Sequence, residues 1–326
     1  MSQAVAEMKT PPKPRVITTE PRFTDKVFRA VVTSGGMVSF VLLGLIGFFL
    51  VYNGFEAMRN AGFGFITGFD WVDAIPEENQ PASYGIGAML YGTIVTGILA
   101  MLMGVPIAVG TALFLSYYAP EWLKKPMVIV VDVMAAIPSI VYGLWGYFVL
   151  MPHAEYWARL IHKYFSFIPI FDMPAPVFTR SPFIAGVVLA IMITPIVTAI
   201  AREVFAQTPL ERIQAAYALG ATKWSMIKAV VFPYGRGGVI GGAMLGLGRA
   251  LGETVAVYTV LNLVYDIKIE VLLSAGGNVA SMIVNKFGES DFVELQALMA
   301  AGFVLFLVTL IVNFLANTII NRTARE

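Results

Sequence analysis

The sequence predicts an all-α integral membrane protein with about six transmembrane helices and with both termini in the cytoplasm. Of the 326 residues, 58% are hydrophobic and only 13% are charged, whereas soluble domains are roughly 45–50% apolar and about 25% charged. Several apolar runs reach the roughly 20 residues that a helix needs to cross a hydrocarbon core about 30 Å thick. Lysine and arginine are distributed unevenly between the segments that connect these runs, which gives the orientation.

Six apolar runs are the predicted spans, and three of them contain an internal proline. Pro106, Pro138 and Pro195 lie in the second, third and fourth spans, where proline usually marks a kink. A further stretch, Val271–Phe287, is too short to span and is split by two glycines, so we expect an interfacial helix on the outer side. The predicted spans are Ala30–Tyr52, Gly87–Tyr118, Met127–Met151, Pro182–Ala201, Gly237–Val264 and Leu295–Ile320.

The orientation follows from the positive charges outside the spans. With six spans, fifteen Lys and Arg residues fall on the side of the two termini and six fall on the other side. Because positive residues concentrate in cytoplasmic segments, both termini are predicted to be cytoplasmic. The predicted organisation is a cytoplasmic tail (1–29), a first span with its outer loop (30–83), a core of five spans (84–320) with a polar cytoplasmic segment (203–236), and a short cytoplasmic C-terminus (321–326).

The composition excludes several kinds of chemistry. The chain has no cysteine, so disulfides, thiolate metal sites and cysteine nucleophiles are excluded. Its two histidines, His153 and His162, lie on a predicted outer loop, and no close pair of carboxylates occurs in the spans. We therefore expect neither a metal site nor an enzyme active site in this chain.

The cytoplasmic segment between the fourth and fifth spans is predicted to form two short helices at a glycine corner. Pro209 can begin the first helix, since its missing N–H is not needed in a first turn. An apolar stripe follows at helical spacing, and Gly220 suits the left-handed residue that ends many helices. The second helix, Thr222–Val231, is expected to end before Pro233. The stripe consists of Ile213, Ala216, Tyr217 and Gly220.

Within this segment, "QAAYALGATKWSMIKAVVFP" resembles the EAA loop of ABC-importer permeases: Glu-Ala-Ala, three residues, Gly, nine residues, then an aliphatic residue, any residue, a hydrophobic residue and Pro. Gln214 stands where the pattern has its acidic residue, so a contact made by that carboxylate in relatives does not carry over. The bland alternative is an interfacial helix that packs against lipid headgroups. The residues that hold the pattern are Ala215, Ala216, Gly220, Val230, Phe232 and Pro233.

The resemblance implies that this short helix couples the permease to a separate ATPase subunit. The coupling-loop residues that it assigns are Gln214, Ala215, Ala216, Gly220 and Pro233. No G-x-x-x-x-G-K-[ST] phosphate loop occurs in the sequence. We therefore expect ATP and Mg²⁺ to be bound by the partner ATPase and no cofactor to be bound by this chain.

Two charges lie inside the predicted fifth span, in "GLGRALGETVAV". Arg249 is about 13 residues past the cytoplasmic end, which is roughly 20 Å deep at 1.5 Å per residue. A charge at such depth is costly unless it is paired or faces water. Arg249 and Glu253 are four residues apart, so a continuous helix would place them on one face, where they could form a structural ion pair. The alternative is that Arg249 lines a gated cavity, where its donor fork matches the oxygens of a tetrahedral oxyanion.

Asp132 is a third charge within an apolar run, in "VVDVMAAIPSIVYGLWG". It lies nearer the cytoplasmic end of the third span, where a carboxylate can reach headgroup water or a cationic residue. We expect a structural role, with a gating role as the alternative.

Three stretches together, "AAIPSIVYGLWGYFVL", the EAA-like loop and "GGVIGGAMLGLGRALGETVAVYTVL", are similar to the PstC family, the permeases of the bacterial phosphate importer. The resemblance implies the fold of a type I ABC importer permease in the bacterial inner membrane. It also implies a sister permease of the PstA type, an ATPase dimer of the PstB type and an outer phosphate-binding protein of the PstS type. The residues that match Arg249 and Glu253 take part in phosphate passage in that family, and we add the adjacent Thr254 to the substrate path.

Two other functions stay open from the sequence. One is a permease for another oxyanion, such as molybdate or sulfate, although the "RALGE" arrangement argues against it. The other is a secondary transporter, which would need no ATPase subunit.

Overall fold

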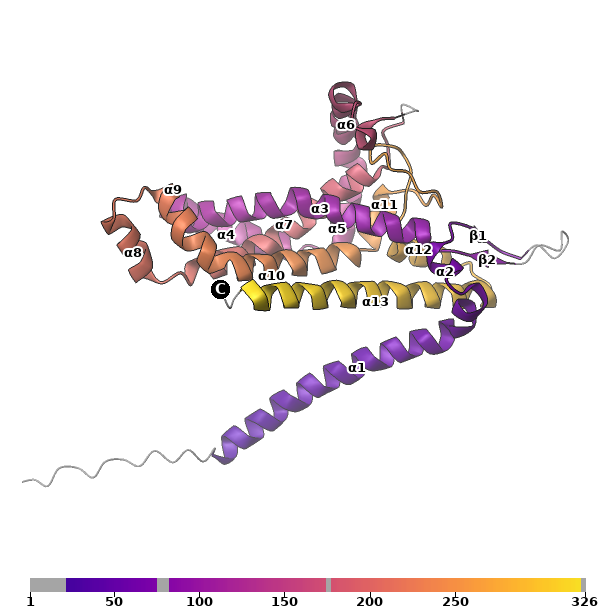
Figure 1. Cartoon of the computed structure of the whole chain (residues 1–326), viewed down its shortest axis with the longest axis horizontal. Helices are drawn as coiled ribbons and strands as arrows, with labels where there is room; N and C mark the ends of the chain where they lie inside the picture. The colour runs from indigo at the N-terminus through magenta and orange to yellow at the C-terminus, as the bar shows by residue number, and fades with distance from the viewer. Residues whose placement is uncertain (1–21, 75–81, 174–176, 324–326) are drawn as a thin grey trace, which may run out of the picture. The chain divides into compact units, whose positions relative to one another are not determined.

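The computed structural model describes residues 22–74, 82–173 and 177–323, and this part of the chain is mostly helical (Figure 1). Most of the predicted N-terminal tail (1–21), part of the first outer loop (75–81) and the last residues (324–326) lie outside it. Two short strands, β1 (Trp71–Val72) and β2 (Ser83–Tyr84), pair antiparallel. The helices are α1 (Phe23–Ala61), α2 (Gly64–Thr67), α3 (Gly87–Leu113), α4 (Glu121–Ala136), α5 (Ser139–Trp145), α6 (Met151–Phe165), α7 (Pro182–Ala206), α8 (Leu210–Ala218), α9 (Lys223–Met226), α10 (Phe232–Leu251), α11 (Val255–Val260), α12 (Val279–Lys286) and α13 (Phe292–Thr323). Three π-helical turns, Phe114–Tyr118, Gly146–Leu150 and Ile227–Val231, and a 3₁₀ turn, Pro169–Phe171, complete the helical structure.

The chain divides into two compact units at Phe48. In the described part of the first unit, α1 carries an almost continuous apolar and exposed surface; Phe40, for example, is 75% exposed. The helix extends beyond the predicted first span at both ends. An apolar helix with so few buried side chains suits a surrounding of lipid or another membrane subunit.

Within the described residues, four helices are long and apolar enough to cross a membrane, and one bent pair of helices adds a fifth candidate. The four are α1, α3 with its π turn, α7 and α13, which correspond to the predicted first, second, fourth and sixth spans. The prediction of a continuous fifth span, Gly237–Val264, is wrong, because that run is divided between α10 and α11.

The predicted kink at Pro138 is a sharp bend. α4 and the helical run that begins with α5 meet there at 96°. Proline has no N–H to donate to the carbonyl four residues before it, which is that of Met134. The Tyr142 hydroxyl donates to this carbonyl at 2.7 Å and satisfies it. Pro106 and Pro195, in contrast, lie inside unbroken helices.

Helices α3, α7, α10 and α13 run side by side and form the core of the second unit (Figure 1). Small residues make this close packing possible in a membrane protein. A Cβ on Gly242 would lie 3.0 Å from Ile200 of α7, and one on Gly246 would lie 2.9 Å from Val197. Gly242 and Gly246 therefore lie on the face of α10 that packs against α7.

The segment Val271–Phe287 is not the interfacial helix that we predicted. Only Val279–Lys286 is helical, and Leu272, Val279 and Met282 are fully buried. The reason is a close backbone contact, because the carbonyl of Gly277 lies directly against Gly92 of α3. The segment thus belongs to the protein core.

Two groups of elements mark the ends of the bundle. In Figure 1, α8 and α9 lie at the end where α13 finishes, and β1, β2, α2 and α12 lie at the opposite end. At that opposite end, the Glu294 carboxylate accepts hydrogen bonds from Trp71 Nε1 at 2.7 Å and from Lys286 Nζ at 2.8 Å. This buried network joins the strand pair and α12 to the start of α13.

Candidate functional site

The fifth apolar run is broken between its two charges. α10 ends at Leu251 and α11 begins at Val255. Gly252, Glu253 and Thr254 form the break, so Arg249 and Glu253 do not share a helix face as the spacing suggested. Interrupted helices of this kind provide ion and substrate sites inside membranes, because their ends present unpaired backbone groups.

Arg249 lies in the last turn of α10, and its side chain is half-buried. Within the described part of the chain, no residue forms a hydrogen bond or an ion pair with its guanidinium. Tyr142 of α5 lies in the same buried cluster as Ala250, the residue that follows Arg249. A cation at a helix C-terminus is stabilised by the helix dipole, typically by about 0.3–1 kcal/mol. The helix end therefore offsets part of the desolvation cost of the Arg249 charge. The N–H donors of the guanidinium remain available for a ligand.

Glu253 is buried, with 8% of its surface exposed. Its Oε1 accepts a hydrogen bond from the Ala256 N–H at 3.3 Å, which satisfies one of the free donors at the start of α11. Its other carboxylate oxygen takes no hydrogen bond from a described residue. The adjacent Thr254 donates its hydroxyl to the Gly252 carbonyl at 3.2 Å and is half-buried.

Two residues that hold the break were missed by reasoning from the sequence. Asn278 is completely buried, and its Nδ2 donates to the backbone carbonyl of Glu253 at 2.8 Å. Its Oδ1 caps α12 by accepting from the Ser281 N–H. The spacing of Asn278 and Ser281 is that of a helix N-terminus and could have revealed the cap. The other residue is Tyr142, whose hydroxyl donates to the Met134 carbonyl at the Pro138 bend and whose ring packs in the same cluster as Ala250, next to Arg249. No sequence pattern around Tyr142 predicts these contacts.

The segment between α7 and α10 follows its predicted local structure at the glycine corner. Gly220 has a φ of +81°. Its N–H donates to the Tyr217 carbonyl, and the Ala221 N–H donates to the Ala216 carbonyl at 3.0 Å. These two bonds are the Schellman arrangement that ends a helix. The predicted helix after Pro209 and its termination at Gly220 are confirmed.

The predicted end of the second helix before Pro233 is wrong. α9 passes through the π turn Ile227–Val231 directly into α10, and Pro233 lies in the first turn of α10. A π turn adds a residue to the helical turn. The wider turn accommodates the proline ring, so the backbone continues without a break.

α8 has no fully buried residue. Ile213 and Ala216 pack on a core cluster that contains Phe205 and Met226. Gln214 and Ala215 point away from that cluster and are exposed. The apolar side chains left uncovered include Leu210 (64% exposed), Tyr217 (43%) and Leu219 (89%).

Asp132 does not lie with the other predicted site residues. Its carboxylate is 3.7 Å from Nη2 of Arg202, near the end of α7, and its side chain is 53% exposed. The two charges link α4 to α7 at the protein surface. This geometry agrees with the structural interpretation of Asp132.

Comparisons with known proteins give the class of this molecule. Residues 104–326 match the family described as "Binding-protein-dependent transport system inner membrane component". The inward-facing MetNI methionine ABC transporter shares the fold, with a TM-score of 0.50 and 18% identity over 73% of this chain and 94% of that chain. The chain is therefore a multi-pass permease subunit with the fold of an ABC type I importer.

Relatives with curated descriptions narrow the family. The chain is 40% identical over 300 residues to the phosphate transport system permease protein PstC 2 of Mycobacterium bovis, covering 90% of this chain and 91% of that protein. It is 39% identical over 307 residues to the phosphate transport system permease protein PstC of Xylella fastidiosa, covering 93% and 92%. It is 36% identical to the probable PstC of Methanocaldococcus jannaschii, covering 88% and 91%. The chain belongs to the PstC family, as the three sequence stretches predicted.

Proposed function

We propose that this chain is the permease subunit of an ATP-driven importer of inorganic phosphate in the bacterial inner membrane. Its relatives, at 35–40% identity over about 90% of the chain, are named as phosphate transport permeases. The structural observation that carries the proposal is the half-buried Arg249, which has no acidic partner among the described residues and lies beside a helix break.

The break supplies the chemistry that phosphate needs. Arg249 offers several N–H donors in a planar fork that matches two phosphate oxygens at once. The free carboxylate oxygen of Glu253 can accept a hydrogen bond from a protonated phosphate oxygen, which sulfate lacks near neutral pH. Thr254 adds a hydroxyl oxygen within the break, which can accept a hydrogen bond while its proton is donated to the Gly252 carbonyl. Together they favour a monoprotonated tetrahedral anion over a fully ionised one.

The exposed α8 is the proposed contact with the ATPase. The partly buried Ile213 and Ala216 pack α8 against the permease. The uncovered Leu210, Tyr217 and Leu219 offer apolar anchors for a groove in a partner. ATP and Mg²⁺ would be bound by that partner, a PstB-type dimer. A rigid-body shift of α8 passes through α9 and the π turn into α10, whose last turn contains Arg249. A PstA-type sister permease and a PstS-type binding protein complete the proposed assembly.

Uptake in vesicles tests the function directly. The chain is expressed with the partner permease, ATPase and binding protein, and with each partner omitted in turn. We expect radioactive phosphate to accumulate only when all partners and ATP are present. Uptake in vesicles without the ATPase would instead indicate a secondary transporter, and the proposal would fail.

Competition separates phosphate from other oxyanions. Arsenate, which carries a proton at neutral pH as phosphate does, is expected to inhibit uptake. Sulfate and molybdate at equal concentration are expected to have no effect. Stronger inhibition by sulfate or molybdate would assign the permease to one of these anions.

A further inference from the structure

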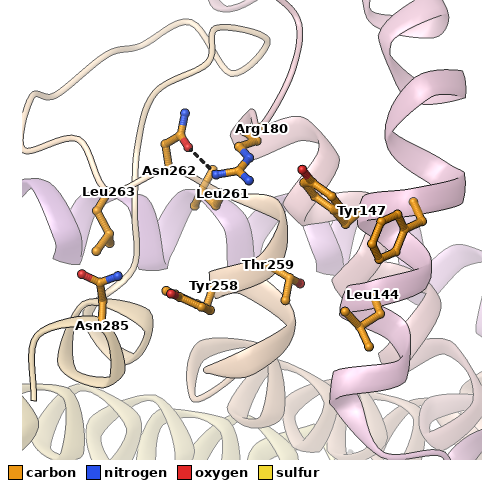
Figure 2. Close-up of a pocket in the computed structure, with 10 residues that line it drawn as sticks. Leu144, Tyr147, Arg180, Tyr258, Thr259, Leu261, Asn262, Leu263 and Asn285 are labelled. Carbon is orange, nitrogen blue, oxygen red and sulfur yellow. Dashed lines mark hydrogen bonds between the residues drawn. The ribbon is translucent and has the colours of Figure 1, made fainter. Parts of the chain in front are cut away.

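A second arginine site lies outside the break between α10 and α11. Nη1 of Arg180 donates to Oδ1 of Asn262 at 3.1 Å, and the guanidinium carbon lies 5.2 Å from the centre of the Tyr147 ring. Asn262 is itself oriented, because its Nδ2 donates to the Ser274 hydroxyl at 3.2 Å. Figure 2 shows Arg180 and Asn262 pointing toward one another, with Tyr147 beside the guanidinium. The arginine head is thus held on two sides.

The backbone at Arg180 is unusual. Its φ is +49°, and among the described residues it is the one non-glycine residue with a positive φ. A side chain in this left-handed region costs roughly 1–2 kcal/mol. Glycine, which adopts such angles freely, would be the cheaper residue in the turn before α7. Backbone strain of this kind is concentrated at functional sites.

Arg180 borders a cavity of about 480 Å³. The cavity is lined by hydrogen-bonding side chains and apolar ones, and Arg180 is the one charged residue among those that line it. Arg180 has five N–H donors, and one of them is used by Asn262 within the described part of the chain. The polar lining consists of Tyr147, Arg180, Tyr258, Thr259, Asn262 and Asn285.

We propose that this cavity binds a phosphate group on the path of the transported anion, with Arg180 as its principal ligand. The inference rests on the proposed phosphate import. α11 joins the two arginine sites, since Thr259 lines the cavity near the end of this helix and Thr254 precedes its start. The two threonines are five residues apart, which is roughly 8 Å along a helix. An anion released from Arg180 is therefore one short helix from Arg249.

A phosphate group has two sources here, free phosphate and the headgroup of an anionic lipid. Chemical modification of arginine distinguishes them without relying on transport. The complete complex is placed in nanodiscs of neutral phosphatidylcholine, treated with phenylglyoxal, and the modification of each arginine is measured by peptide mass spectrometry. Inorganic phosphate is expected to slow the modification of Arg180 severalfold, whereas chloride at equal ionic strength is not.

Arg159 is the control within the same digest. It also lies over an aromatic ring, that of Phe178 at 5.2 Å, but it is paired with Glu155 and does not line the cavity. Phosphate is expected to leave its modification unchanged. Protection of Arg180 by phosphatidylglycerol nanodiscs in the absence of phosphate, with none from free phosphate, would assign the cavity to lipid and overturn its place on the substrate path.

Transport by variants gives the second test. Arg180→Gln removes the charge, and Asn262→Asp is nearly isosteric but neutralises Arg180 with a carboxylate. Both are expected to lower phosphate uptake per assembled complex at least about tenfold, because each weakens a charge-assisted contact with phosphate. Arg159→Gln is expected to transport normally.

The outcomes separate this inference from the proposed function. If the unaltered complex imports phosphate but Asn262→Asp transports normally and phosphate fails to protect Arg180, the cavity is not on the path, and the function of the permease stands. If the unaltered complex imports no phosphate, the proposed function itself fails.

Discussion

The segment around α8 and the break between α10 and α11 contrast in what determines their structure. The corner at Gly220 is set by local chemistry, namely a left-handed glycine and two backbone hydrogen bonds. The break at Glu253 depends on a residue 25 positions further along the chain, since Asn278 donates to its carbonyl. The first region leaves most of its side chains exposed, and the second buries Glu253 and Asn278 within the bundle.

In the proposed function, α8 contacts the ATPase and the break binds phosphate, so the two tasks belong to separate regions of one chain. A surface helix needs only a defined end and uncovered anchors to receive a partner. A charge inside a membrane protein must be paired or hydrogen-bonded by the groups around it, because desolvation makes an uncompensated charge costly. Substitutions in the break are therefore expected to have larger effects than those at the corner.

The largest effect is expected from Arg249→Gln. Loss of two charged hydrogen bonds to phosphate, each contributing about 1.5–3 kcal/mol, is expected to lower uptake at least roughly 100-fold. Arg249→Lys keeps the charge but not the fork and is expected to retain partial uptake. Uptake is measured per assembled complex. Arg202→Gln is the control, because this half-buried arginine is paired with Asp132 at the surface. Equal uptake by the Arg249 and Arg202 variants would contradict the assignment of Arg249 as a phosphate ligand.

The next largest effect on uptake is expected from Asn278→Ala, which is compared with the loss of a second helix cap at Thr222. Asn278 caps α12 and holds the break, whereas Thr222 caps α9 and makes no contact with the break. Asn278→Ala leaves a buried carbonyl without its partner, which costs about 1–3 kcal/mol in addition to the cap. Thr222→Ala loses about 1 kcal/mol for the cap alone. We expect a lower melting temperature for Asn278→Ala and about tenfold lower uptake. Equal melting temperatures for the two variants would show that the bond to Glu253 is unimportant.

A smaller effect is expected from Gly220→Ala. No atom lies within 4 Å of a Cβ at this position, so the cost is confined to the backbone at φ +81°. A left-handed alanine costs roughly 1–2 kcal/mol, which is expected to loosen α8 and lower ATP-driven uptake a fewfold, with ATP hydrolysis less affected. Gly237→Ala has equal room inside α10 and should be neutral or stabilising. Unchanged transport per ATP in Gly220→Ala would contradict the coupling role.

The smallest effect is expected from Asp132→Asn. The carboxylate is half-exposed and 3.7 Å from Arg202, and ion pairs of this kind contribute only about 0–1 kcal/mol. Uptake is expected to stay within roughly twofold of the unaltered complex. A loss as large as that of Arg249→Gln would restore the gating interpretation of Asp132.

The sequence predicted features that depend on composition and local geometry. The length of the apolar runs predicted four of the spans directly, and Gly220 predicted the corner that follows α8. It did not predict that the run around Glu253 breaks, because a four-residue spacing of charges suits a continuous helix equally well. Nor did it predict burial of the Val271–Gly277 stretch, which follows from the contact between Gly277 and Gly92 of α3. Both misses concern contacts between residues distant in the chain.

Access of water and phosphate to the break tests the central claim most directly. Because the chain has no cysteine, Thr254→Cys introduces its one thiol, and Glu289→Cys at an exposed position before α13 is the labelling control. In the assembled importer, a membrane-impermeant thiosulfonate is predicted to modify both, and phosphate is predicted to slow modification at position 254 alone. If the thiol at position 254 resists the reagent throughout the ATP cycle while that at position 289 reacts, the break is sealed from water and does not carry phosphate.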